Sequence, residues 1–369
     1  MTAGMRSVDV FRILTGGPGD VSGLIALIES GRLDPHGIVA ILGKTEGNGG
    51  VNDFTRAYAV VALRACLSRY LECSAEEVEA RIAFVMSGGT EGVLSPHLTV
   101  FVRTASGPLT SVGGKRLSVG IARTRDFLPE EIGRLAQIEE TASAVKAAMR
   151  DAGIDEPADI HYVQVKCPLL TSERIEAAHG RGRDTATVNA YESMAYSRGA
   201  SSLGVALALG EIGGPLRDEQ VLNDWARFSS VASASAGIEL SHNVVIAMGN
   251  SASSTSPFVM GHAVMRDAID LDAIAAAFES VGIEPAVGSG SRQRLVNVFA
   301  KAEAAPEGYV RGFRHTMLED SDIGSTRHAR AAVGGLIGGL AGTGAVYVSG
   351  GAEHQGPPGG GPIAVIARV

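Results

Sequence analysis

The chain has 369 residues, of which 45% are hydrophobic, and it carries a formal net charge of −8. The chain lacks a block rich in Lys and Arg, and together with its acidic balance this argues against a nucleic-acid partner. It also lacks an uncharged apolar run of about 18 residues, so we expect no membrane span. Three scattered cysteines, Cys66, Cys73 and Cys167, are too few for a disulfide framework or a zinc site. We therefore expect a cytoplasmic protein with reduced thiols.

The first part of the chain places a lysine, an arginine and a serine at the ends of predicted elements. A β-rich run, residues 38–44, ends in Lys44, and an Ala-rich helical segment begins near Arg56. The next strand-like run ends in Ser-Gly-Gly, with Ser87 first. Because glycine permits positive φ and a close approach of the backbone to a ligand, this polar turn is a candidate ligand site.

The same order recurs twice further along the chain. Strand-like runs at 160–166 and 295–301 end in lysine, helical segments rich in Ala and Gly follow, and strand ends that contain serine come next. The second copy consists of Lys166, Arg198 and a serine within residues 230–235, and the third consists of Lys301, Arg327 and Ser349. This recurrence indicates three copies of one structural unit.

The serine of the middle copy is the hardest to assign, because the run Ser-Val-Ala-Ser-Ala-Ser offers three choices. The segment GVLSPHLTVF after Ser87 aligns with the segment IELSHNVVIA near residue 240, which pairs Ser95 with Ser241. This alignment selects Ser233. Ser235 and Ser230 remain the alternatives.

The repeat predicts an α/β (α+β) fold made of three homologous units. We place the units at residues 1–105, 112–252 and 258–369, separated by a Gly/Pro-rich stretch and a Ser-rich stretch. Each unit is expected to form a small antiparallel or mixed sheet with helices on its outer face, including helices near 129–151 and 270–281. The three sheets would then pack around a pseudo-three-fold axis.

The residues that recur have a chemistry in common. A neutral lysine can take the proton of a serine hydroxyl, and the alkoxide can then attack a carbonyl carbon. Three lysines and three arginines in one cavity would lower the lysine pKa values and attract an anionic or carbonyl-rich ligand. Backbone N–H groups of the glycine turns could hold an oxyanion. The glycine-rich tail, residues 352–362, suggests either a flexible loop or carbonyls folded around a hard cation.

Several long segments resemble one known family, the ring-opening amidohydrolases, which include cyanuric acid hydrolases and barbiturases. The resemblance runs from about Val8 to the C-terminal residues and covers nearly the whole chain. The segments that carry it are GKTEGNGGVNDFTR at 43–56, MSGGTEGVLSPHLTVF at 86–101, KCPLLT at 166–171, MAYSRGASSLGVALALGE at 194–211, RHTMLEDSDI at 314–323 and YVSGGAEHQGPPGGGPIAVIA at 347–367. Two departures are Gly50, where members often carry Cys, and the Ser-Ala-Ser middle turn.

The resemblance implies an active site on the axis of a three-unit fold. It implies hydrolysis of one ring C–N bond of cyanuric acid to carboxybiuret, which loses carbon dioxide to give biuret. The implied nucleophile is Ser233 and its base is Lys166, with Lys44 and Lys301 in supporting roles. The implied substrate-binding residues are Arg56 with Ser87 and Gly88, Arg198 with Ser233 and Ala234, and Arg327 with Ser349 and Gly350.

The family resemblance also implies a structural divalent cation, Mg²⁺ or Ca²⁺, and no catalytic cofactor. The residues that match the cation site are Glu303, Ala352, Gln355, Gly356, Pro357 and Gly360. We further expect a homo-oligomer, a tetramer, although the residues themselves do not fix the oligomeric state.

Two other functions remain open at this point. Barbituric acid has carbon in place of one ring nitrogen, so a barbiturase would need one unit to differ, and the stretch around Ile323 is where we look for that difference. A non-catalytic binder would use the arginines without the chemistry. We favour cyanuric acid because all three Lys-Arg-Ser sets are intact.

Overall fold

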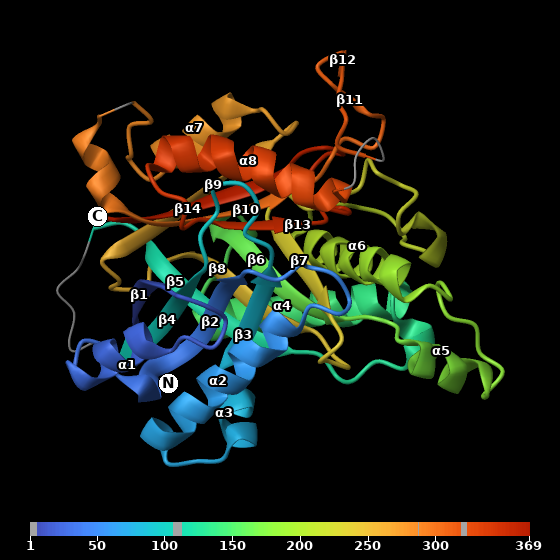
Figure 1. Cartoon of the computed structure of the whole chain (residues 1–369), viewed down its shortest axis with the longest axis horizontal. Helices are drawn as coiled ribbons and strands as arrows, with labels where there is room; N and C mark the ends of the chain where they lie inside the picture. Colours follow the sequence, from blue (N-terminus) through green and yellow to red (C-terminus); the bar gives the residue numbers. More distant parts are fainter. Residues whose placement is uncertain (1–5, 106–112, 287, 319–322) are drawn as a thin grey trace.

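The strands form three separate sheets, each built from one stretch of the chain. The computed structural model describes residues 6–105, 113–286, 288–318 and 323–369 (Figure 1). Within these residues there are three four-stranded sheets and a two-stranded ribbon, β11 (Tyr309–Val310) with β12 (Phe313–Arg314). The predicted α/β class is therefore confirmed, and the structural match described below supports the threefold arrangement.

The three sheets share one strand order. In each, the first strand pairs antiparallel with the fourth, the fourth pairs antiparallel with the second, and the second pairs parallel with the third. The first sheet contains β1 (Arg6–Leu14), β2 (Ile38–Thr45), β3 (Ala83–Gly88) and β4 (His97–Ala105). The second contains β5 (Arg116–Arg123), β6 (Ile160–Pro168), β7 (Ala232–Gly237) and β8 (Val244–Ser251). The third contains β9 (Phe258–Met265), β10 (Leu295–Ala302), β13 (Tyr347–Gly350) and β14 (Gly361–Arg368).

A local irregularity repeats with the strand order. Where the second strand of each sheet pairs with the fourth, the register shifts at the start of the second strand. The shift lies between Ile38 and Ala40, between Ile160 and Tyr162, and between Leu295 and Asn297. Because the same bulge occurs at the same place, the three units are equivalent in register as well as in topology.

The sheets lie at residues 6–105, 116–251 and 258–368, which fall inside the three predicted units. The first five residues of the first unit and the predicted boundary at residues 106–112 lie outside the described residues. The limits of the units therefore stay a prediction. Among the described residues, no helix combines the length and the apolar character that a membrane crossing requires.

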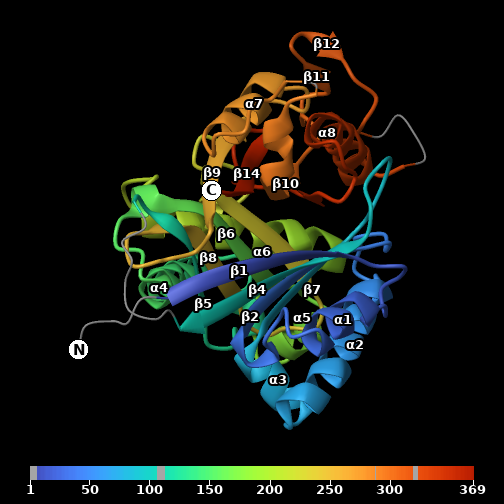
Figure 2. The ribbon, with the colours of Figure 1, turned by 90° about the vertical axis from the view of Figure 1, so that its left-hand side faces the viewer.

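Helices cover the outer face of each sheet, as Figure 2 shows for all three units. One helix joins the first strand to the second in each unit, namely α1 (Ser22–Glu29), α4 (Leu135–Ala152) and α7 (Leu271–Glu279). The helices that join the second strand to the third are α2 (Phe54–Leu71), α3 (Ala75–Arg81), α5 (Ser172–His179), α6 (Ala190–Leu209) and α8 (Ser325–Ala341). Short 3-10 turns lie at Pro35–Gly37, Pro129–Glu131, Pro157–Asp159, Asp218–Gln220 and Gly290–Arg294.

Side-chain caps fix where the helices beside the site begin. The Asp53 carboxylate accepts a hydrogen bond from Thr55 N and starts α2, and the Asn189 side chain accepts from Tyr191 N and starts α6. These polar side chains satisfy amide groups that a helix leaves unpaired at its first turn. The caps therefore hold Arg56 and Arg198, on those two helices, at defined depths in the fold.

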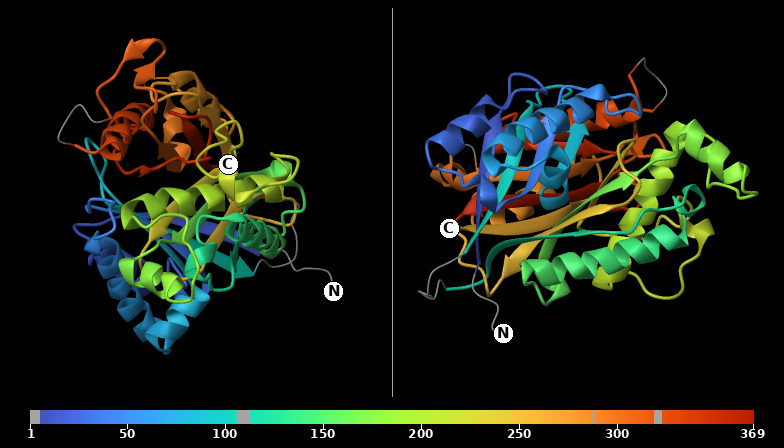
Figure 3. Two further views of the ribbon diagram at one scale, coloured as in Figure 1. Left: turned by 90° about the vertical axis from the view of Figure 1, so that its right-hand side faces the viewer. Right: turned by 90° about the horizontal axis from the view of Figure 1, so that it is seen from below.

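The inner faces of the three sheets pack against one another around a common core (Figure 3). This core contains residues from every sheet, and in it the rings of Phe101, Tyr162 and Tyr347 each contact the ring of Phe299. Each sheet also has one further apolar cluster, which lies between the sheet and its own helices. Since both faces of each sheet are covered, the second and fourth strands are almost entirely buried, which explains their near-continuous apolar sequences, whereas the first strands β1, β5 and β9 are only partly buried.

Helix α4 lies so close to β5 that only glycine fits at one contact. A Cβ atom at Gly120 would overlap the Ala148 carbonyl oxygen and the Ala152 amide nitrogen. Both are backbone atoms, so they cannot move aside without moving the helix. The approach of helix and sheet in the second unit therefore depends on this glycine.

We predict that Gly120→Ala lowers the free energy of unfolding by about 1–3 kcal/mol, because the added methyl group forces α4 away from the sheet. Urea unfolding measures the effect. The matched control is Gly17→Ala, where a Cβ meets no atom within 4 Å, and its effect should stay within about 0.5 kcal/mol. Equal stability of the two variants would show that α4 is not held at this distance.

Candidate active site

Parallel strand pairing places one lysine beside one serine in every unit. The lysine lies near the end of the second strand, the serine lies near the end of the third, and these two strands are neighbours in each sheet. The facing pairs are Lys44 with Ser87, Lys166 with Ser235, and Lys301 with Ser349. The serine of the second unit is therefore Ser235.

The alignment that selected Ser233 is wrong by two residues. Ser233 faces Gln164, and its hydroxyl donates to the Gln164 amide oxygen at 2.9 Å. The equivalent residues in the other units are Val85 and Tyr347, so Ser233 belongs to the layer below the serines that face lysine. The connection from the third strand to the fourth is one residue shorter in the second unit than in the first. Because Ser and Ala alternate in β7, an alignment shifted by two residues still matches a serine with a serine.

The neighbouring positions change in the same way. Ala236, which follows Ser235, takes the place predicted for Ala234, whose amide donates to the Gln355 side chain instead. Ser230, the other alternative, bonds through its hydroxyl to Glu211. Neither Ser230 nor Ser233 lines the cavity between the three units.

The three serine hydroxyls meet at one point of the structure. Ser349 Oγ lies 3.3 Å from Ser87 Oγ and 3.3 Å from Ser235 Oγ. Lys44 Nζ donates to Ser87 Oγ at 3.2 Å, and Lys301 Nζ donates to Ser349 Oγ at 3.3 Å. All three lysines are fully buried. We call the cavity around these groups the central cage; it is lined by Gly49, Arg56, Ser87, Gly88, Met194, Arg198, Ser235, Ala236, Arg330, Ser349 and Gly350.

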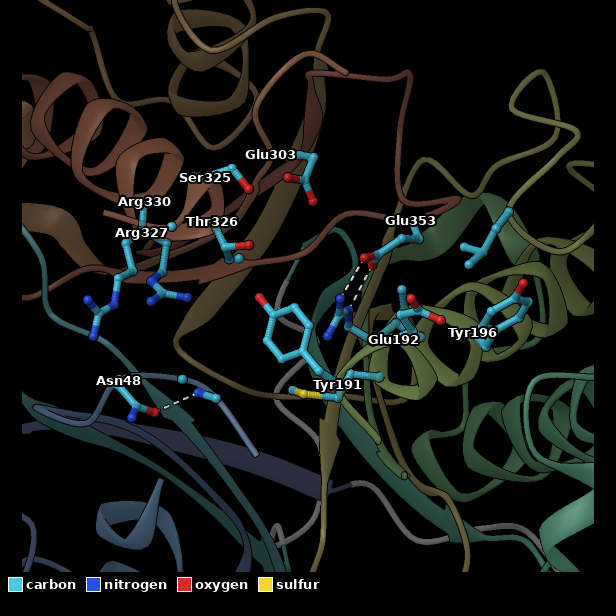
Figure 4. Close-up of a pocket in the computed structure, with 18 residues that line it drawn as sticks. Asn48, Tyr191, Glu192, Tyr196, Glu303, Ser325, Thr326, Arg327, Arg330 and Glu353 are labelled. Atoms are coloured by element: carbon cyan, nitrogen blue, oxygen red, sulfur yellow. Dashed lines mark hydrogen bonds and ion pairs between the residues drawn. The ribbon is translucent and has the colours of Figure 1, made fainter. Parts of the chain in front are cut away.

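Two of the three predicted arginines line the central cage, and the third assignment is corrected. Arg56 and Arg198 lie in its wall, but in the last unit the residue there is Arg330 rather than Arg327. Both side chains project from α8 and Figure 4 shows them side by side. Arg327 lies almost one turn earlier and is 42% exposed, whereas the Arg330 side chain is 4% exposed. The two positions share a helix face, so the sequence spacing did not separate them.

The cage opens into a larger outer cavity of about 670 Å³. Arg327, Thr326 and Tyr191 line this outer cavity, and Arg198 and Arg330 line both cavities. Figure 4 shows Glu353 across the outer cavity from the arginines of α8. A small polar molecule could therefore reach the serines from solvent through a passage whose wall carries three arginines and three glutamates, namely Arg198, Arg327, Arg330, Glu192, Glu303 and Glu353.

Each serine turn also carries a glutamate that the sequence reasoning missed. The pattern Ser-x-Gly-x-Glu recurs as Ser87 to Glu91, Ser235 to Glu239 and Ser349 to Glu353. Had this pattern been used, it would have identified Ser235 in place of Ser233. Glu91 binds both Nε and Nη2 of Arg330 at 2.8 and 2.6 Å, and Glu353 binds Nε and Nη2 of Arg198 at 2.7 and 2.5 Å.

Burial lowers the pKa of all three lysines, but to different extents. Burial and then the Arg330 charge hold the pKa of Lys44 well below its usual value. Burial and then Arg198 lower the pKa of Lys301 to about 7. The pKa of Lys166 is lowered by burial but raised by the Glu239 carboxylate, 3.0 Å away. The cage therefore contains amines that can be neutral near physiological pH, which a base requires.

Glycine is required where the serine turn of the first unit meets the cap of α2. A Cβ atom at Gly88 would overlap the Asp53 carboxylate, and Gly89 has φ of 104°, a conformation that favours glycine. Ala236 is the matching residue in the second unit and carries a Cβ into the cage. The three turns therefore differ in side chain and also in backbone, because Gly351 shares the positive φ of Gly89, at 78°, whereas Gly237 does not.

The residues proposed for a cation include one carboxylate, Glu303, which is half-buried and lines the outer cavity. Its Oε1 accepts a hydrogen bond from Ala304 N and its Oε2 accepts one from Ala352 N, each at 3.0 Å. Burial and then the Glu353 charge raise the pKa of Glu303. The Gly360 amide donates to the Pro357 carbonyl and closes the tail into a turn. Among the described residues, no group of three or more His, Cys, Asp and Glu side chains could hold a metal, so a cation here would depend on Glu303 and backbone or amide oxygens.

Comparisons with known proteins agree with this geometry. Residues 9–368 match the family model described as amidohydrolase ring-opening protein. The chain is 69% identical over 364 residues to the cyanuric acid amidohydrolase of Bradyrhizobium diazoefficiens, covering 98% of each chain. It is 62% identical over 366 residues to the cyanuric acid amidohydrolase of Pseudomonas sp. strain ADP, covering 99% of this chain and all of the relative.

Solved structures give the same result. One, described as a cyanuric acid hydrolase that arose by structural concatenation, superimposes with a TM-score of 0.96 at 62% identity and covers 99% of this chain and 100% of its own. A second, a cyanuric acid hydrolase from A. caulinodans, has a TM-score of 0.90 at 47% identity and covers 99% of both chains. The chain therefore belongs to the ring-opening amidohydrolase family.

Proposed function

We propose that this chain is a cyanuric acid amidohydrolase in which Ser235 attacks a ring carbonyl and Lys166 serves as the base. The observation that carries the proposal is that three serine hydroxyls meet at one place: Ser349 Oγ lies 3.3 Å from both Ser87 Oγ and Ser235 Oγ. Each serine faces a buried lysine on the neighbouring strand, and three arginines line the cavity around the serines. Cyanuric acid has three equivalent carbonyl groups, so a three-fold cage matches its shape. The relatives named above carry the same activity in their names.

The substrate would lie across the axis with its carbonyl oxygens toward the arginines. A planar guanidinium offers several donors in a fixed geometry, so Arg56, Arg198 and Arg330 can each hold one oxygen. The serine turns at Ser87–Gly88 and Ser349–Gly350 would hold two sides of the ring. The third turn, Ser235–Ala236, would bring its hydroxyl to a ring carbon.

The reaction then proceeds through a covalent acyl-enzyme. Neutral Lys166 takes the proton of Ser235, and Ser235 Oγ forms a bond to the nearest carbonyl carbon. Backbone N–H groups of the turns and arginine side chains stabilise the oxyanion. The ring C–N bond breaks, and the Lys166 ammonium returns its proton to the departing nitrogen. Water releases the acyl group as carboxybiuret, which loses carbon dioxide to form biuret. Lys44 and Lys301 hold the neighbouring serines and keep the field in the cage positive.

Ser235→Ala should lower kcat for cyanuric acid by about 10³-fold or more, because it removes the nucleophile. Ser233→Ala is the matched control: it should keep most of the activity and cost about 1–3 kcal/mol in unfolding free energy, since it leaves the Gln164 amide oxygen unpaired. Biuret formation measures the first effect and thermal unfolding the second.

The reverse ranking, in which Ser233→Ala inactivates the enzyme and Ser235→Ala does not, would reject the assignment. Assays with barbituric acid in parallel separate the two ring-opening activities. Tight binding of cyanuric acid without turnover in the wild-type chain would favour a non-catalytic binder.

We also propose a structural divalent cation, Mg²⁺ or Ca²⁺, held through Glu303 with Ala352, Gln355, Gly356, Pro357 and Gly360. The support is a half-buried carboxylate beside the like charge of Glu353, an arrangement that a cation would stabilise. Its chemistry there is structural: it would fix the tail that follows Ser349 and so the Glu353 partner of Arg198.

Removal of divalent cations with a chelator should lower the melting temperature, and adding Mg²⁺ or Ca²⁺ should restore it. Glu303→Gln should abolish this response, because the anionic oxygen that binds the cation is lost. Differential scanning calorimetry at matched ionic strength is the measurement. If the wild-type melting temperature is the same with and without chelator, no structural cation is held at Glu303.

The chain is further proposed to form a homotetramer in the cytoplasm. Free thiols at Cys66, Cys73 and Cys167 support a reducing location. An exposed apolar stripe along α2, formed by Phe54, Tyr58 and Val61, supports contact between copies, since these side chains are 80%, 59% and 59% exposed. Light scattering of the purified chain should give four times the monomer mass, and a monomer would contradict the proposal.

A further inference from the structure

The three glutamates of the serine turns do not all serve the same partner. Glu91, from the first unit, holds Arg330 of the third unit, and Glu353, from the third unit, holds Arg198 of the second. Each pair links a serine turn to the arginine of a neighbouring unit. If the pattern continued around the axis, Glu239 of the second unit would hold Arg56 of the first.

Glu239 departs from this pattern and pairs with a lysine. Its Oε1 lies 3.0 Å from Lys166 Nζ, and the Lys166 side chain is 1% exposed. Arg56 donates instead to two carbonyl oxygens, Gly50 O at 2.7 Å and Ala236 O at 3.2 Å, and among the described residues its buried Nε has no hydrogen-bond partner. The symmetry of charges is therefore broken at one lysine and one arginine.

This departure from the repeated pattern of charges distinguishes the Lys166–Ser235 pair from the other two lysine–serine pairs. The amines of Lys44 and Lys301 donate to their own serines and to carbonyl oxygens of the cage. Of the three lysines, Lys166 is the one that forms an ion pair with a carboxylate within the part of the chain that the structure describes. On the same side of the cage, Arg56 donates to the carbonyl oxygen of Ala236, the residue after Ser235.

We propose that Glu239 is a positioning residue that selects Ser235–Lys166, among three similar pairs, as the one that reacts. The inference rests on the proposed function. Glu239 orients the Lys166 amine and stabilises the positive charge that Lys166 gains when it takes the Ser235 proton, as the third group does in other nucleophile–base–orienter sets. By binding Lys166, Glu239 also leaves Arg56 without a carboxylate partner and available to the substrate.

The charges around Lys166 and Glu239 determine how removal of the Glu239 carboxylate would change the pH dependence of the reaction. The groups that act on Lys166 are Glu239, Arg56 and the Cys167 thiol, and those that act on Glu239 include Lys166, Arg56 and Arg174 of α5. Glu239 raises the pKa of Lys166 while burial and Arg56 lower it. Removing the carboxylate therefore lowers the pKa of Lys166. Since the base must be neutral, the acid limb of kcat/KM then moves to lower pH.

Glu239→Gln is the direct test. We expect kcat for cyanuric acid to fall about 100-fold, because the ammonium that forms in the transition state loses its counter-charge, while the acid limb of kcat/KM shifts to lower pH. Glu239→Asp keeps the charge, so it should recover part of kcat and retain the wild-type acid limb. Glu91→Gln and Glu353→Gln are the matched comparisons: they disturb Arg330 and Arg198, so they should raise KM and leave the acid limb in place.

A second readout separates this inference from the proposed function. A serine-reactive fluorophosphonate, followed by peptide mass spectrometry, should label Ser235 in the wild-type chain and label it at least about tenfold more slowly in Glu239→Gln. This result would support the role of Glu239 even if cyanuric acid were not turned over. Labelling that occurs mainly at Ser87 or Ser349, or that is unchanged in Glu239→Gln, would overturn it. So would an acid limb that moves equally in Glu91→Gln.

Discussion

The parallel pairing of the second and third strands is the constraint on which the site depends. In each sheet this pairing brings a lysine and a serine to the same edge, because parallel neighbours end on the same side. The common core then turns the three edges toward one axis, so that three serine hydroxyls lie within hydrogen-bonding distance along one chain of contacts. The cage is therefore a property of the whole chain, and no single unit contains it.

The same geometry creates an electrostatic problem that the molecule resolves unevenly. Lys44, Lys166 and Lys301 are buried together, and burial alone disfavours their charged forms. Carboxylates neutralise Arg198 and Arg330 in bidentate pairs, whereas the hydrogen bonds of Arg56 to described residues go to the carbonyl oxygens of Gly50 and Ala236. In the proposed function, a bound carbonyl-rich ring would accept hydrogen bonds from the arginine donors that remain. The chemistry proposed here thus follows from a cage whose strand pairing is symmetric and whose charges are not.

Much of this arrangement could be predicted from the sequence because it recurs. The lysines Lys44, Lys166 and Lys301 end apolar strands, and three copies in one order indicated three units around an axis. Two kinds of detail were lost. Alternating Ser and Ala in β7 gave two serines on one face, so Ser233 was chosen over Ser235. On α8, Arg327 and Arg330 share a face, and only the depth of the helix against the sheet separates them.

The glutamates were missed for a different reason. A carboxylate four residues after a serine is common on protein surfaces, and its partner here lies in another unit, more than 150 residues away in the case of Glu353 and Arg198. Local patterns do not report such a contact. Their recurrence as Ser-x-Gly-x-Glu was the available signal, and it would also have corrected the choice of serine.

The central claim is that three units direct their serines and arginines at one symmetric ligand. A crystal structure of the Ser235→Ala variant with cyanuric acid tests it most directly. The account predicts a ring centred between residues 87, 235 and 349, with one carbonyl oxygen at each of Arg56, Arg198 and Arg330 and a ring carbon about 3 Å from the position of the missing hydroxyl. A ring bound only in the outer cavity beside Arg327, away from the serines, would contradict it.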